Sequence, residues 1–220
     1  MNQQFEQHVD SLIQQYKQRK HPLDYKSRYQ LVVMVILSAQ DSDKHINELA
    51  PGFFSLYPDM ASLATATPEE LHRHLSSVRN FGNKCSWLVQ LAQTVKRDEN
   101  IPVTMDELTK LPGVGRKSAN VIIRESGAEA EGVIVDLHVL RVAPRLGIAT
   151  GTQPVKIEKQ LMAAFPRNQW NALGMAISFL GREICRPTNP KCEMCVMNAV
   201  CSFYTGNPAV ESNNNELQLF

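Results

Sequence analysis

The chain has 220 residues, enough for one large domain or two small ones, and 43% of them are hydrophobic, enough for a packed core. No apolar run approaches the roughly 20 residues that a membrane-spanning helix needs, and the N-terminus lacks the basic and apolar segments of a signal peptide, so we expect a cytoplasmic protein with no membrane partner. The formal net charge is only +1, so nucleic-acid binding gains no support from bulk charge and must rest on local basic clusters.

The first third of the chain has a helical pattern. Residues 1–20 place apolar side chains at helical spacing, and a proline follows that ends the helix. Asp24 is a candidate cap for the next helix, expected from Tyr25 to about Ser38 and buried because its centre is apolar all round. A polar turn follows this helix at residues 38–43. Gln40 lies in that turn and is a candidate probe, that is, a side chain presented in a fixed position.

Capping residues mark the helices that follow. Ser42 or Asp43 can cap a helix through Leu49, and Thr67-Pro68-Glu69-Glu70 is a capping box with proline at the first helical position. We expect a short turn at residues 81–84 and then a helix that extends to about Val95.

The stretch from Thr104 to Lys117 predicts a hairpin of two helices. Thr104 to Glu107 reads as a capping box, and Leu111-Pro112-Gly113-Val114-Gly115-Arg116-Lys117 predicts a tight turn, because both glycines tolerate positive φ. A glycine-rich turn at a helix N-terminus presents backbone N–H groups that suit a phosphate. Lys117, just behind the turn, would bring an amine to the bound ligand. The alternative is an ordinary corner between helices with a surface lysine.

A second candidate residue follows the apolar triplet Val133-Ile134-Val135. Asp136 is a carboxylate at the end of a buried segment, and it can also cap a helix from Leu137 to Leu146; the two roles are compatible. Further helices are expected from Pro154 and from Trp170 to Leu180. No alternating strand pattern recurs, so the sequence predicts an all-α fold, with a disordered tail at residues 205–220.

Four of the five cysteines lie close together, at Cys185, Cys192, Cys195 and Cys201. In an intracellular protein such clustering predicts a metal site rather than disulfides. Four thiolates can bind tetrahedral zinc or a [4Fe–4S] cluster. Structural zinc sites more often use two close pairs, and here only Cys192 and Cys195 form one, so the spacing favours the iron–sulfur cluster. The fifth, Cys85, is expected to be a buried or free thiol.

Four motifs in this order give the chain a family resemblance. They are Leu37-Ser38-Ala39-Gln40, the glycine hairpin, Val135-Asp136-Leu137-His138 and the cysteine pattern, and with them residues 20–202 resemble the endonuclease III family of helix-hairpin-helix DNA glycosylases. The resemblance implies a six-helix lobe at residues 22–132 and an iron–sulfur cluster lobe formed by residues 1–21 and 133–204. It also implies a monomer whose partner is double-stranded DNA with a damaged base or an abasic site, the target nucleotide being flipped out of the duplex.

The same resemblance implies a role for each candidate residue. Lys117 would attack C1′ of the damaged nucleotide and form a Schiff base, and β-elimination would then nick the strand. Asp136 would stabilise the positive charge on the sugar or accept a proton from the lysine. The four cysteines would hold a structural [4Fe–4S] cluster. Gln40 would fill the gap left by the flipped base, and further DNA contacts are implied at Leu111, Gly113, Val114, Gly115, Arg116 and His138.

The chain departs from the family pattern at two positions. Leu137 follows the aspartate where threonine is common, and Asn80 aligns with a leucine that acts as a wedge on the opposite strand. The resemblance implies that oxidised pyrimidines are the favoured lesions. The alternatives are a specialised glycosylase for uracil, mismatched thymine or alkylated bases with weak lyase activity, and a DNA-binding relative without catalysis. The adenine-excising relatives lack a lysine at the position of Lys117, so this residue argues against adenine excision.

Overall fold

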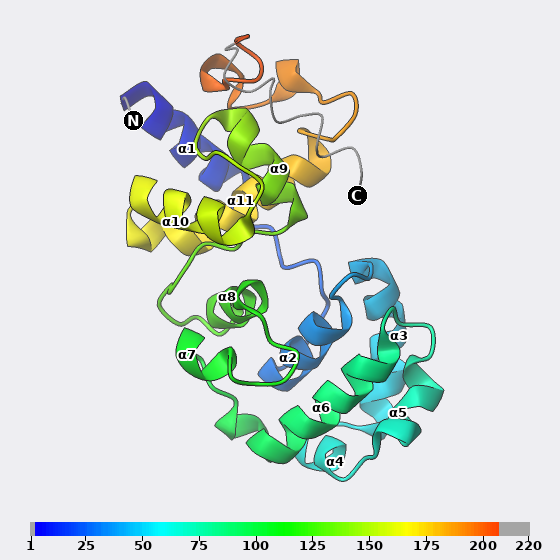
Figure 1. The fold of residues 1–220 in the computed structure, drawn as a ribbon. Coiled ribbons are helices and arrows are strands. Elements are labelled where there is room, and N and C mark those ends of the chain that lie inside the picture. Colours follow the sequence, from blue (N-terminus) through cyan, green and yellow to red (C-terminus); the bar gives the residue numbers. More distant parts are fainter. Residues whose placement is uncertain (1–2, 207–220) are drawn as a thin grey trace. The chain divides into compact units, whose positions relative to one another are not determined.

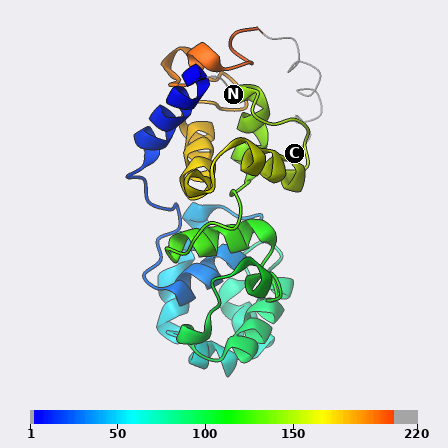
Figure 2. The same ribbon diagram turned by 90° about the vertical axis from the view of Figure 1, so that its left-hand side faces the viewer.

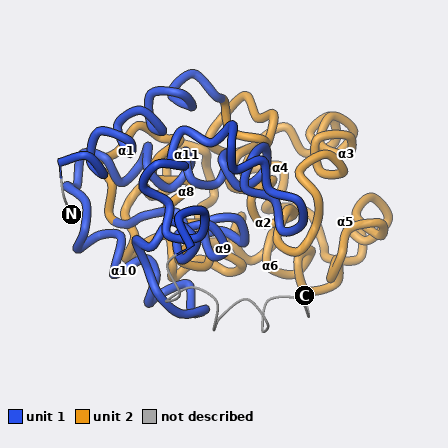
Figure 3. Tube along the Cα trace, turned by 90° about the horizontal axis from the view of Figure 1, so that it is seen from above, with its two compact units in different colours: residues 1–19, 132–220 blue, residues 20–131 orange. Residues whose placement is uncertain are grey.

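All regular elements that the structure describes are helical. The structure is a computed structural model in which residues 3–206 are described, and no strand occurs among them (Figure 1). The predicted all-α class is therefore confirmed. The chain divides into two compact units, unit 1 with residues 1–19 and 132–220 and unit 2 with residues 20–131 (Figure 3). Among residues 3–206, none of the helices has both the length and the apolar character needed to cross a membrane.

Helix α2 (Arg28–Leu37) is the centre of unit 2. Its side chains from Leu31 to Leu37 are all buried, as the apolar run predicts. Helices α6 (Phe81–Val95) and α8 (Arg116–Glu125) pack against it (Figures 1 and 2). The remaining α-helices of the unit are α3 (Asp43–Leu56), α4 (Met60–Ala64), α5 (Pro68–Leu75) and α7 (Met105–Leu108).

The start of α2 differs from the expectation. Its cap is Ser27 rather than Asp24, and the helix begins at Arg28. The Ser27 hydroxyl oxygen accepts a hydrogen bond from the Gln30 N–H at 3.2 Å, which satisfies one of the free N–H groups of the first turn. The Asp24 N–H instead donates to Asn47 Oδ1 on α3 at 2.9 Å, so this residue lies in a loop held by another helix.

Some of the other helix boundaries agree with the sequence predictions and some do not. The Thr67–Glu70 capping box forms as predicted. Residues 81–84, expected as a turn, are instead the first turn of α6, and α4, capped by Asp59, was not expected. Helix α1 (Gln3–Tyr16) ends before the predicted residue 20. The predicted disordered tail covers residues 205–220, of which 207–220 lie outside the described residues.

Helix α11 (Trp170–Glu183) is the centre of unit 1 and is buried from Leu173 to Gly181. Helices α1 and α9 (Leu137–Leu146) pack against it, and α10 (Pro154–Ala164) packs against α9. A Cβ atom on Gly174 would lie 2.8 Å from the Ile134 carbonyl oxygen, so only glycine allows this approach. α11 therefore supports the segment that leads into Asp136.

Candidate functional site

The predicted hairpin turn lies between α7 and α8 in unit 2. The Val114 N–H donates to the Leu111 carbonyl at 3.2 Å and closes the turn. Gly113 has a φ of +77°, and a Cβ atom there would lie 3.1 Å from Cε3 of Trp87 and 3.2 Å from Cγ2 of Ile36. Both the backbone conformation and the close approach therefore require glycine at this position.

The end of the turn opens onto the N-terminus of α8. Gly115 is its N-cap, with a φ of −86° and no side-chain cap, and Arg116 and Lys117 form the exposed start of the helix. The N–H groups of a first helical turn have no acceptor within the helix and suit an anion. Leu111 and Val114 are buried, so these two predicted DNA contacts can reach a ligand only through their main chain.

Gln40 lies directly beyond α2 in unit 2. Its side chain is exposed and its φ is +60°, an uncommon conformation for a residue other than glycine. The side chain of Asn80, from the loop before α6, donates a hydrogen bond to Gln40 Oε1 at 3.0 Å. The structure thus joins Gln40 to the second of the two positions where the sequence departs from the family.

Asp136 is the N-cap of α9 in unit 1, and both of its carboxylate oxygens have partners. Oδ1 accepts hydrogen bonds at 2.9 Å from the N–H groups of His138 and Val139. Oδ2 accepts one from the Ser178 hydroxyl at 2.6 Å, and the Arg182 guanidinium lies 3.9 Å away. The carboxylate is therefore fixed in position by its own unit.

Ser178 and Arg182 are the side-chain partners of Asp136, and sequence reasoning missed their pairing with this carboxylate. Both lie on α11, one turn apart, and Gly174 lies one turn before Ser178. Residues at this spacing share one face of a helix, so a small residue followed by a hydroxyl marks a face that approaches another segment closely. This spacing is the sequence signal that points to the partner of Asp136.

His138, a predicted DNA contact, is in the first turn of α9 and is partly buried. Its Nδ1 lies 3.3 Å from Nη2 of Arg141, which also donates to the Gly181 carbonyl at 3.0 Å. Leu137, the other position where the sequence departs from the family pattern, is 67% exposed, a high value for a leucine. Asp136, Leu137 and His138 thus form one end of α9 in unit 1, whereas Lys117 and Gln40 belong to unit 2.

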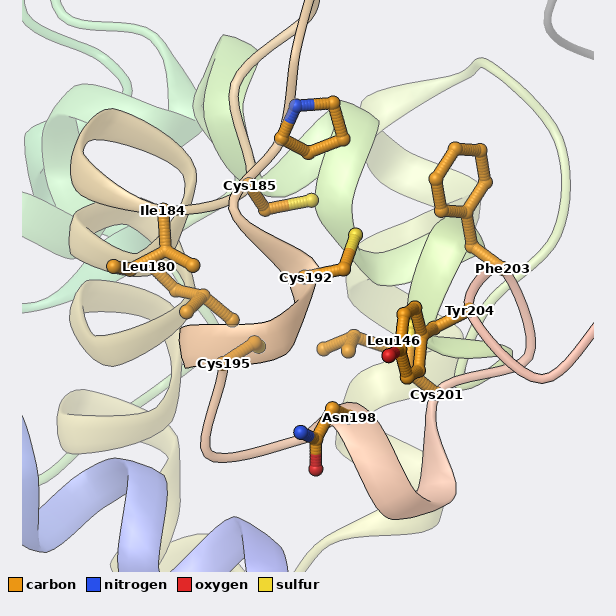
Figure 4. A pocket seen from close by; sticks show the side chains of 11 residues that line it. Leu146, Leu180, Ile184, Cys185, Cys192, Cys195, Asn198, Cys201, Phe203 and Tyr204 are labelled. Atoms are coloured by element: carbon orange, nitrogen blue, oxygen red, sulfur yellow. The ribbon is translucent and has the colours of Figure 1, made fainter.

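The four clustered cysteines line one pocket in unit 1, after the end of α11 (Figure 4). Arg145 of α9 is buried beside them. Its Nη1 lies 3.6 Å from Cys185 Sγ and donates to the Arg186 carbonyl at 2.8 Å. The guanidinium also stacks on the Phe203 ring, 4.7 Å from its centroid. A buried cation next to the sulfur atoms offsets the charge that bound thiolates carry.

The electrostatics of the pocket favour a bound cation. The pKa of Cys195 is raised to about 11, mainly by burial and also by the nearby thiols of Cys201, Cys185 and Cys192, although a hydrogen bond from the Met197 N–H lowers it. Burial and then Cys185 likewise raise the pKa of Cys192. Thiolates that repel one another in a buried site become stable when a metal centre binds them.

The four cysteines around the pocket supply the sulfur donors that a zinc ion or an iron–sulfur cluster requires. Within residues 3–206, no three His, Cys, Asp or Glu side chains are placed to share one metal ion. Zinc takes its sulfur ligands at about 2.3 Å from one point, whereas an iron–sulfur cluster binds its thiolates at separate iron atoms.

Sequence comparison identifies similar proteins over most of the chain. Residues 33–167 match the model of the HhH-GPD superfamily of base excision DNA repair proteins. The chain is 36% identical to endonuclease III of Synechocystis sp., over 81% of this chain and 83% of the relative. It is 32% identical to endonuclease III of Bacillus subtilis, over 88% and 89% of the two chains.

Structure comparison agrees with these matches. A trapped covalent intermediate of an endonuclease III with DNA aligns with a TM-score of 0.83 and 29% identity, over 93% of this chain and 97% of that chain. The similarity extends through nearly the whole chain, so the predicted helix-hairpin-helix glycosylase fold is confirmed.

Proposed function

Because the chain belongs to the endonuclease III family of the HhH-GPD superfamily, we propose that it is a bifunctional DNA glycosylase and AP lyase of base excision repair. It removes a damaged base, an oxidised pyrimidine in this proposal, from double-stranded DNA and nicks the strand at the abasic site. The observation that carries the proposal is Lys117, an exposed amine in the first turn of α8, directly behind a glycine turn that suits a phosphate.

Lys117 is the proposed nucleophile. Its Nζ lone pair forms a bond to C1′ while the glycosidic bond breaks and its electron pair leaves with the base, which takes up a proton. Nitrogen then loses one proton to solvent and a second to O4′ as the C1′–O4′ bond breaks, which opens the sugar ring and gives a Schiff base. Removal of a C2′ proton then expels the 3′ phosphate, and hydrolysis of the Schiff base returns the free amine. The nick thus follows from the same covalent intermediate as base release.

Asp136 is the proposed electrostatic partner of the reaction. Positive charge develops on the sugar as the base departs, and a carboxylate stabilises it. The hydrogen bonds from α9 and Ser178 hold this carboxylate in one orientation, so little reorganisation is needed during the reaction.

The remaining roles concern binding. The hairpin main chain from Leu111 to Gly115, with Arg116, grips the DNA backbone, and His138 adds a further contact. Gln40 occupies the space that the flipped base leaves. Cys185, Cys192, Cys195 and Cys201 hold a [4Fe–4S] cluster that shapes the loop around it, and the protein acts as a monomer.

One set of assays tests the proposal. Duplexes with thymine glycol, dihydrouracil, uracil, a thymine mismatch or an abasic site are scored for base release, for nicking and for covalent trapping by borohydride. Lys117→Gln is expected to abolish trapping and to retain DNA binding. Lys110→Gln, which alters an exposed lysine just before the turn, is the matched control and keeps trapping.

The outcomes separate the alternatives. Trapping by Lys117→Gln at the wild-type yield refutes the assignment of the nucleophile. Release of uracil or thymine without nicking identifies a specialised glycosylase, and binding without any release identifies a non-catalytic relative.

A further inference from the structure

Two exposed loops of unit 2 are joined by hydrogen bonds between residues far apart in sequence. We name residues 38–42 and 76–80 the paired loops. Asp41 Oδ2 accepts a hydrogen bond from the Arg79 N–H at 2.9 Å. His45 connects them again, because its Nδ1 lies 2.8 Å from Asp41 Oδ1 and its Nε2 lies 3.1 Å from Ser77 Oγ. The paired loops therefore form one braced unit.

A buried lysine holds the base of the paired loops. Lys84 of α6 is only 1% exposed, and its Nζ donates to the carbonyl oxygens of Leu37 and Ala39 at 2.7 Å each. Leu37 is the last residue of α2, where helical acceptors lack partners, and Ala39 lies in the turn that follows. A charged donor at this end fixes the direction in which the chain leaves the helix, immediately before Gln40.

The tips of the paired loops carry two residues in an uncommon backbone conformation. Gln40 has a φ of +60° and Asn80 a φ of +57°. Non-glycine residues at positive φ are sterically disfavoured and persist where the surrounding structure holds them, often at functional sites. Both side chains are exposed, so burial does not explain the conformation.

The two tip side chains form a pair of amides. Asn80 Nδ2 donates to Gln40 Oε1 at 3.0 Å. An amide has two donor hydrogens and an acceptor oxygen, so the pair keeps Gln40 Nε2 and Asn80 Oδ1 as a donor and an acceptor for a ligand. This is the chemistry that reads the edge of a nucleobase.

We propose that Gln40 and Asn80 act as one reading element that contacts the base left unpaired opposite the lesion and sets which opposite base is accepted. The inference rests on the proposed function, in which Gln40 occupies the space of the flipped base. A side chain hydrogen-bonded to Gln40 must lie at that same space. The unpaired base there exposes its Watson–Crick edge, whose donors and acceptors differ among the four bases.

The experiment measures binding and excision against each opposite base. Duplexes carry a tetrahydrofuran abasic analogue, or dihydrouracil, opposite A, C, G or T. Asn80→Gly and Gln40→Gly each remove one amide and tolerate positive φ, so neither adds backbone strain. Gln90→Ala, at an exposed amide further along α6, is the matched control, and circular dichroism verifies folding.

For the wild-type protein, we expect the Kd for the most weakly bound duplex to exceed the Kd for the most tightly bound duplex by about fivefold or more. This ratio corresponds to one net hydrogen bond. Each glycine variant lowers the ratio to about twofold or less, the double variant lowers it no further because the amides act as a unit, and the control keeps it. A glycine variant that retains the wild-type ratio, or a wild-type protein that binds all four duplexes equally, overturns the inference.

Failure of the inference and failure of the proposed function give different results. Binding to the abasic analogue requires no chemistry, so an opposite-base preference without base release or nicking refutes the enzyme and leaves the reading element standing. Normal excision with no dependence on Asn80 refutes the reading element alone.

Discussion

Gly113 offers the sharpest test of the hairpin. In Gly113→Ala the new residue must keep a φ of +77°, a left-handed conformation that costs an L-residue about 1–2 kcal/mol. The added methyl group would also lie 3.2 Å from Cγ2 of Ile36, a side chain with no exposed surface. Overpacking of this kind typically adds about 1–3 kcal/mol. We therefore expect unit 2 to lose about 2–5 kcal/mol of its free energy of unfolding.

Gly115→Ala is the matched control in the same turn. Its φ is −86°, and an added Cβ meets no atom within 4 Å. Only the preference for glycine over alanine at an N-cap is lost, which we expect to be about 1 kcal/mol or less. The two substitutions therefore add the same methyl group but differ in predicted cost.

Urea unfolding followed by tryptophan fluorescence measures the difference. Trp87 and Trp170 are the two tryptophans, in unit 2 and unit 1 respectively. A Trp170→Phe background leaves Trp87, beside Gly113, as the reporter of unit 2. Equal midpoints for Gly113→Ala and Gly115→Ala would refute the argument that positive φ and the contact with Ile36 require glycine.

Three further predictions concern the carboxylates and the cysteines. Asp136→Asn keeps the cap of α9, so the free energy of unfolding changes by less than about 1 kcal/mol. The rate of single-turnover excision falls about 10²–10⁴-fold. An unchanged rate contradicts the proposed catalytic role of Asp136. For Asp41, burial raises the carboxyl pKa, but hydrogen bonds from the Arg79 N–H, His45 and the Ser42 N–H outweigh burial and leave the pKa lowered. A lowered folded-state pKa stabilises the fold above the unfolded pKa, and this contribution is lost as pH falls through the folded pKa. The urea midpoint of Asp41→Asn should therefore lie below that of the wild type at about pH 6 and approach it below about pH 4; a pH-independent difference contradicts this. Cys192→Ser should lose visible absorption and bound iron, while Cys85→Ser keeps both; zinc in place of iron in the wild-type protein contradicts the cluster.

Local signals predicted most helices because the interactions that start them lie within a few residues. The Thr67–Glu70 capping box closes over three residues, and both of its hydrogen bonds form. The start of α2 could not be predicted in the same way, because two capping residues compete. Ser27 is the cap that forms, and Asp24 lies in a loop whose N–H donates to Asn47 on α3.

Residues 81–84 show how a distant contact changes the interpretation of a glycine. Gly82 suggested a turn, yet it lies inside α6. The chain turns earlier, at Asn80, where the bond from the Arg79 N–H to Asp41 fixes the preceding loop. That contact joins residues 38 positions apart, so no local pattern of the sequence contains it.

The candidate site likewise combines residues that local motifs predict with contacts that only the folded structure shows. Lys117 and Asp136 were identified because their motifs are local: a glycine turn before a helix, and an apolar triplet before a cap. Their assigned roles remain proposals. The partners of Asp136 come from α11, and the Ser178 hydroxyl is 42 residues away in sequence. Residue types at a site can thus be recognised from short motifs, while the contacts that orient them depend on packing between helices.

The two oxygen atoms of Asp136 have different partners, so its structural role and its proposed chemical role can be tested separately. Oδ1 caps α9 through two main-chain N–H groups, whereas Oδ2 faces Ser178 and Arg182. A substitution that preserves Oδ1 therefore keeps the helix while it removes the charge. Ser178→Ala acts the opposite way, since it keeps the charge and removes the hydrogen bond to Oδ2. If orientation of Oδ2 matters, Ser178→Ala slows excision although Asp136 is intact; if only charge matters, excision is unchanged. The comparison separates the position of the carboxylate from its presence.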